Sequence, residues 1–228
     1  MSLKDEIVGL ALEHVDLVGV TPSESFDHEP PGLCPSSLLT GAKSVIVLGS
    51  QLNDSIISNV TTDDSAEGIS FQVLLTDHQD TVRRILSEIA YRVGRLLTRA
   101  GYRWRHVGDQ LDKRDLSGTM SNKHAAILAG LGVWGRHSMV LTPQFGPRQY
   151  FCSVVTDAEI DGLPVATPHA HPCTGCGLCI RECPAHAISQ PPADRPYAID
   201  RFRCAMYMSG AGGCNLCLAR CPAGRRAL

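Results

Sequence analysis

The chain has 228 residues, of which 43% are hydrophobic, 5% aromatic and 19% charged, and its formal net charge is −2. This composition is typical of a globular protein with one real core, and the near-neutral charge predicts neither a nucleic-acid partner nor an anionic membrane surface. No apolar run has the length of a membrane span, and residues 1–6 lack the apolar core of a signal peptide. We therefore expect a cytoplasmic protein with no membrane partner, made of one medium domain and a small appendage.

The first part of the chain predicts alternating helices and strands. Apolar residues at helical spacing predict a helix over 3–15, and a short strand follows at 17–20. Residues 21–37, rich in Pro, Ser and acidic side chains, are expected to form a loop. The β-branched run 44–49 predicts a buried strand, and the polar stretch 53–68 predicts a second loop.

A long amphipathic helix is predicted next. One apolar stripe runs from Val82 to Leu97, Thr76 or Asp77 is expected to cap its start, and Gly101 is expected to end it. The apolar pattern beyond this helix predicts a strand at 102–107, a helix at 123–131, and strands at 139–141 and 149–156.

A domain boundary is predicted where the periodicity stops. The stretch 161–172 contains three prolines and no regular apolar pattern, which indicates a linker. We therefore expect a first domain over 1–160, and a second unit over 161–228 that includes the linker.

Eight of the ten cysteines lie in the last quarter of the chain. Without an export signal, clustered thiols predict metal ligands rather than disulfides. The first group has the spacing C-x2-C-x2-C-x3-C-P over 173–184, and the second group spans 204–222. This spacing is typical of bacterial ferredoxins that carry two 4Fe-4S clusters. Zinc would explain paired Cys-x2-Cys units, but not the third cysteine of the first group or the repeated trailing Cys-Pro.

The spacing also predicts which cysteines share a cluster. Three thiolates of a tight C-x2-C-x2-C loop face one cube, while the last cysteine of the run faces the other. Cluster one then takes Cys173, Cys176, Cys179 and Cys221, and cluster two takes Cys183, Cys204, Cys214 and Cys217. Of the other two cysteines, Cys152 is expected to be a buried inert thiol within a strand, and Cys34 could be exposed in its Pro-rich loop.

The segment 122–157 carries a distinctive pattern. It contains Ala-Gly-Leu-Gly at 129–132, Trp-Gly-Arg-His-Ser at 134–138, Thr-Pro-Gln-Phe-Gly-Pro-Arg at 142–148, and Val-Val-Thr-Asp at 154–157. Together with the linker and the cysteine segment, this pattern resembles the epoxyqueuosine reductase and reductive dehalogenase superfamily. The resemblance is strong over 122–222 and extends only to the layout of elements before that. It implies an α+β fold, in which a nitroreductase-like α/β domain binding cobalamin precedes a two-cluster ferredoxin-like domain.

The resemblance further implies that the loop 134–140 and the strand 149–154 border the corrinoid. The implied cofactor-binding residues are Gly132, Trp134, Arg136, His137, Ser138, Val140, Arg148 and Phe151. Among them, Arg136, His137 and Arg148 could meet amide or phosphate groups of the cofactor. The residues by themselves leave a plainer alternative, in which the glycines serve a helix end and a tight turn, and the arginines form surface ion pairs.

Catalytic candidates follow less directly from the resemblance. Epoxyqueuosine reductases place an acidic proton donor upstream of these glycines, where the chain has Asp112 and Asp115. We name Asp115, with a solvated aspartate as an equal alternative. Reductive dehalogenases use a tyrosine and a basic residue near the corrinoid, for which Tyr150 and Lys123 are candidates. The helical-repeat extension of the tRNA-acting enzymes and the twin-arginine leader of respiratory dehalogenases are both missing, so we expect a member of the broader superfamily.

These features predict an iron–sulfur oxidoreductase. It would take electrons from a low-potential donor such as a ferredoxin or flavodoxin and pass them through both clusters to a corrinoid, which supplies the difficult chemistry. The substrate would be a small molecule or the corrinoid of a partner protein. Two alternatives stay open: a flavin enzyme, because a nitroreductase-like layout can hold FMN, and a non-catalytic electron-transfer or corrinoid-activating protein.

Overall fold

The computed structural model describes residues 2–28, 34–63, 65–108, 116, 118, 120–163 and 173–224. Two compact units divide the chain: Met1–Ser50, Val82–Leu131 and Tyr150–Thr167 form the first, and Gln51–Thr81, Gly132–Gln149 and Pro168–Leu228 form the second. Each unit is therefore assembled from segments that are distant in sequence. The expected domains 1–160 and 161–228 stay a prediction.

The first unit is built on a four-stranded sheet with the strand order β1-β2-β6-β3. The strands are β1 (Leu17–Pro22), β2 (Ser44–Gln51), β6 (Gln149–Thr156) and β3 (Trp104–Val107). β1 pairs with β2 and β3 pairs with β6, both antiparallel. The first seven residues of β2 are buried, as its β-branched apolar run predicts. The predicted strands are therefore present.

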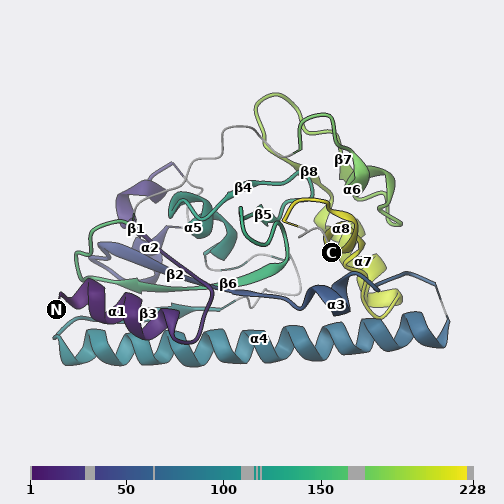
Figure 1. Cartoon of the computed structure of the whole chain (residues 1–228). Helices are drawn as coiled ribbons and strands as arrows, with labels where there is room; N and C mark the ends of the chain where they lie inside the picture. The colour runs from purple at the N-terminus through teal and green to yellow at the C-terminus, as the bar shows by residue number, and fades with distance from the viewer. Residues whose placement is uncertain are drawn as a thin grey trace. The chain divides into compact units, whose positions relative to one another are not determined.

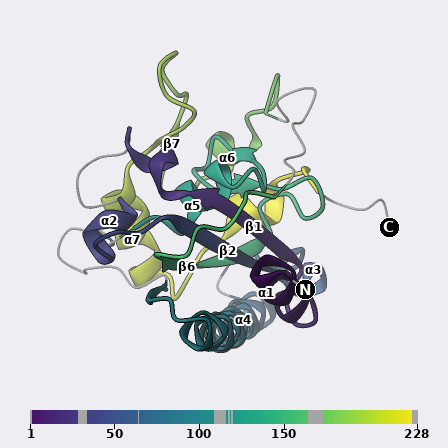
Figure 2. The same ribbon diagram turned by 90° about the vertical axis from the view of Figure 1, so that its left-hand side faces the viewer.

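Helices cover both faces of this sheet (Figure 1). α1 (Leu3–Leu12) and the C-terminal part of α4 (Ala66–Arg99) lie on one side, and α5 (Asn122–Leu128) lies on the other. Figure 2 shows α4 end-on beneath the strands. The thiol of Cys152 on β6 donates to the backbone oxygen of Leu86 on α4 at 3.4 Å, so this cysteine is buried in the core as predicted.

The predicted start of the long helix is wrong. α4 begins at Ala66, so Thr76 and Asp77 lie inside the helix instead of capping it. Tertiary contacts explain the extra turns, because Leu75 is fully buried and the Gln72 side chain bonds two backbone carbonyls within the second unit. The predicted end is confirmed. Gly101 has a φ of 86°, and its N–H bonds the carbonyl of Thr98 at 3.1 Å.

Two predicted loops contain short helical turns. The stretch 21–37 includes the 3-10 helix η1 (Ser23–Phe26) and α2 (Pro35–Leu38), while residues 29–33 lie outside the described part of the chain. The stretch 53–68 includes α3 (Asp54–Ile57), which Asn53 caps by accepting the N–H of Ser55 at 2.9 Å. Polar composition pointed to loops here, but the same residues also cap helices.

The second unit combines α3 and the N-terminal part of α4 with short elements around the cysteine segments. Its two-stranded sheets pair β4 (Val133–Trp134) with β5 (Val140–Leu141), and β7 (Ile188–Ser189) with β8 (Ala198–Ile199). Its C-terminal helices are α6 (Leu178–Arg181), α7 (Arg201–Gly210) and α8 (Leu216–Arg220). α6 packs against α8, which brings the two cysteine groups together.

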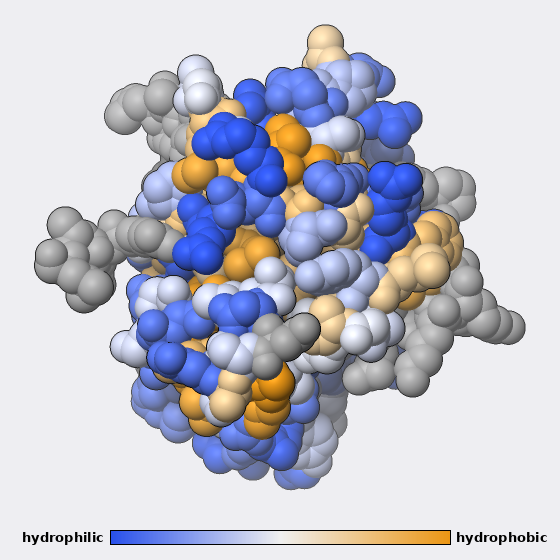
Figure 3. Space-filling model, turned by 90° about the vertical axis from the view of Figure 1, so that its right-hand side faces the viewer, coloured by the Kyte–Doolittle hydropathy of each residue, from blue (hydrophilic) through white to orange (hydrophobic). Residues whose placement is uncertain are grey.

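The surface carries scattered apolar side chains. α7 buries none of its residues and leaves 48% of Phe202 and 77% of Met206 exposed. On the face drawn in Figure 3, apolar residues form small groups separated by polar ones. Among the described residues, no helix combines the length and the apolar character that crossing a membrane requires.

Candidate metal centre

The four cysteines predicted for cluster one meet at one pocket of the second unit. Its lining comprises Cys173, Cys176, Cys179, Cys221, His137, Leu141, Leu178, Pro222 and Ala223. Gly175 has a φ of 71°, and the turn it makes lets the N–H of Cys176 donate to the carbonyl of Cys173 at 3.2 Å. Cys179 lies on α6 and Cys221 directly follows α8. Segments from both ends of the cysteine region therefore supply one set of thiols.

These thiols surround a volume instead of meeting at a point. Within the described ranges, no three His, Cys, Asp or Glu side chains converge closely enough to hold a single metal ion. The ligands of a 4Fe-4S cube stand at its separate corners, and four cysteines around one pocket have that character. Thiolate sulfur is also the donor that such clusters require, so the residues present fit this group.

Burial raises the pKa of two thiols at this pocket, those of Cys179 and Cys221. The pKa of Cys179 rises to about 11, first because of burial and then because of the charges of Cys173, Cys221 and Cys176. Burial likewise raises the pKa of Cys221, although the positive charge of Arg148 acts in the opposite direction. Cys179 and Cys221 are therefore protonated at neutral pH without a metal, and a bound cation has to displace their protons.

The four cysteines predicted for cluster two form a second neighbourhood. Burial raises the pKa of Cys217, and the charges of Cys214, Cys204, Cys179 and Cys183 raise it further. Because charge interactions weaken with distance, these four thiols lie in the neighbourhood of Cys217. Cys179 belongs to the cluster-one group, so the two groups adjoin.

Backbone turns and one helix shape the cluster-two loop. Gly213 has a φ of 129° and Asn215 a φ of 60°, which turns the chain sharply on either side of Cys214. The amide of Gln72 donates to the carbonyl of Cys214 at 3.0 Å, and the amide of Gln79 donates to the Asn215 side chain at 3.3 Å. The N-terminal part of α4 therefore supports this loop, a role that sequence reasoning missed. The sequence offered one signal for this role, the two glutamines Gln72 and Gln79, which lie at buried positions of the helix.

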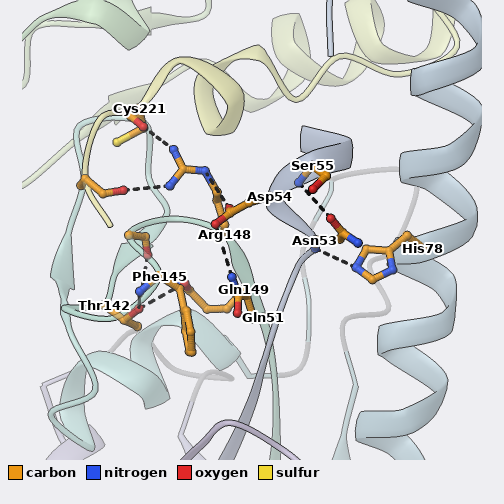
Figure 4. A network of polar contacts seen from close by, with 12 residues as sticks. Gln51, Asn53, Asp54, Ser55, His78, Thr142, Phe145, Arg148, Gln149 and Cys221 are labelled. Carbon is orange, nitrogen blue, oxygen red and sulfur yellow. Dashed lines mark hydrogen bonds and ion pairs between the residues drawn. The ribbon is translucent and has the colours of Figure 1, made fainter. Parts of the chain in front are cut away.

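The loop 142–148 holds the segment that carries Cys221. The backbones of Thr142 and Gly146 exchange two hydrogen bonds of 2.9 Å. Gly146 has a φ of 57°, and any Cβ added there would collide with the carbonyl of Ala223. Arg148, only 2% exposed, donates to the carbonyl of Cys221 and, at 3.0 Å, to that of Ala223 (Figure 4). This loop therefore supports the cluster-one pocket.

Arg136 and His137 also face the cysteine segments. Arg136 donates to the carbonyl of Cys176 at 2.7 Å. His137 is 2% exposed, lines the cluster-one pocket, and accepts the N–H of Met139 on Nδ1 at 3.2 Å. The described contacts of both side chains lie within the protein, and their predicted contacts with a corrinoid stay a prediction.

The remaining predicted residues of this segment shape the β4–β5 hairpin. Gly132 allows close approach, because a Cβ there would collide with the carbonyl of Leu141. The ring of Trp134 packs against Tyr197 with centroids 4.8 Å apart. Ser138 and Val140 are buried, and Ser138 has a φ of 62° in the turn.

Tyr150 and Phe151 belong to the first unit. The hydroxyl of Tyr150 accepts a hydrogen bond from Arg83 at 2.9 Å, and the Arg83 guanidinium stacks 4.5 Å from the ring centroid. Arg83 is therefore a basic partner of this tyrosine that the sequence did not suggest. Phe151 is 8% exposed and packs on Gly49. The catalytic candidate Asp115, like Asp112, lies outside the described residues.

Sequence comparison connects the chain to known iron–sulfur proteins. Residues 172–225 match the family described as a 4Fe-4S dicluster domain. A tetrachloroethene reductive dehalogenase of Dehalobacter restrictus is 32% identical over 144 residues, covering 56% of this chain and 25% of that protein. An epoxyqueuosine reductase of Synechococcus is 28% identical over 175 residues, covering 76% of this chain and 47% of that protein. The chain thus spans between a quarter and about half of these relatives.

Solved structures lead to the same two families. A catabolic reductive dehalogenase in complex with 3-bromo-4-hydroxybenzoic acid superposes with a TM-score of 0.76 at 21% identity, covering 96% of this chain and 31% of that chain. A reductive dehalogenase whose structure suggests a mechanism for B12-dependent dehalogenation superposes with a TM-score of 0.75 at 22% identity. This match covers 96% of this chain and 32% of that chain. An epoxyqueuosine reductase with a tRNA-Tyr stem loop superposes with a TM-score of 0.64 at 18% identity, covering 97% of this chain and 65% of that chain.

At these identities the structures show a shared fold. The mixed helix and sheet architecture agrees with the predicted α+β class. The resemblance predicted from the sequence is therefore confirmed: the chain carries a 4Fe-4S dicluster domain, and both reductive dehalogenases and epoxyqueuosine reductases are among its sequence relatives and structural neighbours.

Proposed function

We propose that this protein is an iron–sulfur oxidoreductase that carries two 4Fe-4S clusters and delivers electrons through them to a corrinoid held by a nitroreductase-like N-terminal domain. One observation carries the proposal. Eight cysteines fall into two adjoining groups, and each group draws on segments that are distant in sequence. This arrangement supports the proposed crossed ligand set of a two-cluster ferredoxin, in which an electron on one cluster could reach the other.

The chain's own residues prepare both sites. Cys173, Cys176, Cys179 and Cys221 would hold cluster one, and Cys183, Cys204, Cys214 and Cys217 would hold cluster two. Bound clusters would supply one-electron transfer at low potential. The protein limits water around Cys179 and Cys221, each 8% exposed, and fixes the cysteine loops through side-chain hydrogen bonds to backbone carbonyls. Such outer contacts orient the ligands and tune the metal centre.

The corrinoid is supported by the relatives and by the sequence pattern at 122–157. Among the residues named for it, Gly132, Trp134 and Arg136 are half-buried and keep accessible surface, whereas the other five are enclosed by protein. We therefore propose that these three border the cofactor. A bound corrinoid would supply a cobalt centre that accepts the electrons.

Tyr150 is the catalytic candidate that the structure describes. Its hydroxyl is held by Arg83, so a basic group is present to stabilise negative charge on the tyrosine oxygen during proton donation. In this role Arg83 replaces Lys123, the basic residue suggested by sequence. The substrate class, a small molecule or a partner's corrinoid, and the low-potential donor, a ferredoxin or flavodoxin, belong to the same proposal.

Anaerobic purification tests the proposal directly. We expect about eight irons per chain with matching sulfide, since each cluster holds four, and we expect corrinoid absorption bands beside those of the clusters. Flavin bands in their place would favour the flavin alternative, and cluster absorbance alone would favour an electron-transfer module. An iron content far below about eight per chain would reject the two-cluster assignment.

A cysteine pair provides the matched variants. Cys179→Ala should remove about half of the iron, because it takes one ligand from cluster one, and metal binding is coupled to folding of the segment. Cys34→Ala is the control, because that thiol lies in the first unit and donates to the carbonyl of Phe26 at 3.4 Å. Full iron content in the Cys179→Ala protein would overturn the ligand assignment.

A further inference from the structure

Arg148 is a buried cation at the edge of the cluster-one pocket. It is 2% exposed, and its guanidinium donates to the carbonyls of Cys221 and Ala223. Cys221 is itself 8% exposed and a predicted cluster ligand. Because the guanidinium contacts the backbone of Cys221 itself, its charge lies next to the place of a predicted ligand. An enclosed charge acts strongly here, because little water screens it.

A short network at the start of α3 partly offsets this charge. The carboxylate of Asp54 lies 3.5 Å from Nε of Arg148, and its side chain is 47% exposed. The amide of Gln51 donates to the same carboxylate at 3.4 Å. His78 accepts the N–H of Asn53 at 2.9 Å, which anchors the start of α3 (Figure 4). The counter-charge is thus partly in water, whereas the arginine is enclosed, and their effects at Cys221 do not cancel.

The two cysteine groups are supported by different kinds of side chain. Two arginines, Arg136 and Arg148, hold the backbone carbonyls of Cys176 and Cys221 in the cluster-one group. The cluster-two loop is held by the neutral amide of Gln72, which donates to Cys214. The backbone is fixed in both places, but a positive charge accompanies the support at cluster one.

We propose that Arg148 is a positioning residue that raises the reduction potential of cluster one above that of cluster two, so that electrons enter at cluster two and collect at cluster one. This inference rests on the proposed two-cluster function. Reduction adds a negative charge to a cluster, and a buried cation nearby favours the more negative state. The neutral support at cluster two gives no such preference. Arg148 thereby sets the direction of electron flow as well as the place of Cys221.

A redox titration of the anaerobically purified full chain, followed by electron paramagnetic resonance, tests this assignment. The Cys179→Ala protein identifies the signal of cluster one by its loss. Arg148→Gln should shift the potential of cluster one downward and leave that of cluster two in place. Arg148→Lys keeps the charge without the paired hydrogen bonds, so it should restore most of the potential.

Asp54→Asn provides the opposite test. It keeps Arg148 but removes the counter-charge, so the potential of cluster one should shift upward. This variant also decides the matter if Arg148→Gln loses cluster one altogether. An unchanged potential of cluster one in Asp54→Asn, or in an Arg148→Gln protein that keeps its full iron content, would show that Arg148 is a structural clamp and would overturn the inference, as would equal shifts of both clusters. Wild-type protein without iron would instead reject the proposed function itself.

Discussion

The side-chain amide of Gln72 donates hydrogen bonds to the carbonyl of Cys214 at 3.0 Å and to that of Thr61 at 2.8 Å. Gln72 is 9% exposed, so this one side chain ties the start of α4 to the cluster-two loop away from water. The polar residue thus has a structural task that its helical spacing does not reveal.

Replacing this glutamine should destabilise the second unit. Gln72→Leu removes both hydrogen bonds, at a cost of about 1 kcal/mol each, and frees the loop that carries Cys214. We expect lower stability to denaturant and faster loss of iron from cluster two. Val73→Ala is the matched control, because Val73 is the next residue of the same helix and is 63% exposed. Equal iron retention in the two variants would contradict the role of Gln72.

Gly146 should tolerate no side chain. Gly146→Ala would strain a left-handed backbone with a φ of 57° and drive a methyl group into the carbonyl of Ala223. Left-handed strain alone costs about 1 kcal/mol, and the collision adds to it. Gly101→Ala separates the two effects, because Gly101 has a φ of 86° and no atom lies within 4 Å of the place that its new methyl group would take. Thermal unfolding should show a clearly larger loss for Gly146→Ala, with iron lost from cluster one.

Cluster assembly should depend on pH in a direction fixed by Cys179. Its pKa of about 11 without metal means that the thiol is protonated at neutral pH, and iron must displace that proton. Reconstitution of iron-free protein should therefore go further at about pH 9 than at about pH 6.5. Iron and sulfide analysis after removal of excess reagent measures this. Uptake that is independent of pH, or greater in acid, would contradict it.

The raised pKa of Cys179 also affects the stability of the iron-free protein. Here a higher pH is unfavourable, whereas it favours cluster assembly. A raised pKa favours the folded state while the thiol is protonated, so this contribution is complete below the unfolded value of 9.0 and is lost as the pH rises through about 11. Iron-free protein should accordingly unfold more easily near pH 11 than near pH 8, as followed by circular dichroism.

Asp157 should stabilise the first unit at neutral pH and not in acid. Its carboxylate accepts from Nε of Arg103 at 2.7 Å and from the Arg103 backbone at 2.8 Å, and this pairing lowers the pKa of Asp157. The contribution is present above the ordinary value of 3.8 and is lost as the pH falls through the lowered pKa. Asp157→Asn should cost up to about 1 kcal/mol near pH 7 and nothing in strong acid.

A second ion pair serves as the control for Asp157. Glu159 pairs with Lys43 at 3.4 Å, with side chains 83% and 56% exposed. Glu159→Gln should change denaturant stability very little at any pH, because water screens an exposed pair. A difference between Asp157→Asn and wild type that persists in strong acid would mean that shape, not charge, carries the effect.

Local patterns predicted much of the first unit. The strands at 44–49 and 149–156 are present because a run of β-branched apolar residues identifies a buried strand without further context. The end of α4 at Gly101 could also be predicted from the sequence, because a left-handed glycine ends a helix locally. The start of α4 could not be predicted in this way, because Gln72 bonds the carbonyl of Cys214, which lies far away in sequence.

The sequence by itself identified the dicluster segment and predicted its cysteine framework, because the ligands of a 4Fe-4S cube follow a local spacing that leaves few alternatives. It also pointed to the pattern at 142–148, but not to its task. Tertiary structure alone decided that Gly146 and Arg148 support the segment after Cys221, and that Gln72 supports Cys214. The physical reason is that a polar side chain is either a solvated group or a buried clamp according to what packs around it, and those neighbours come from elsewhere in the chain.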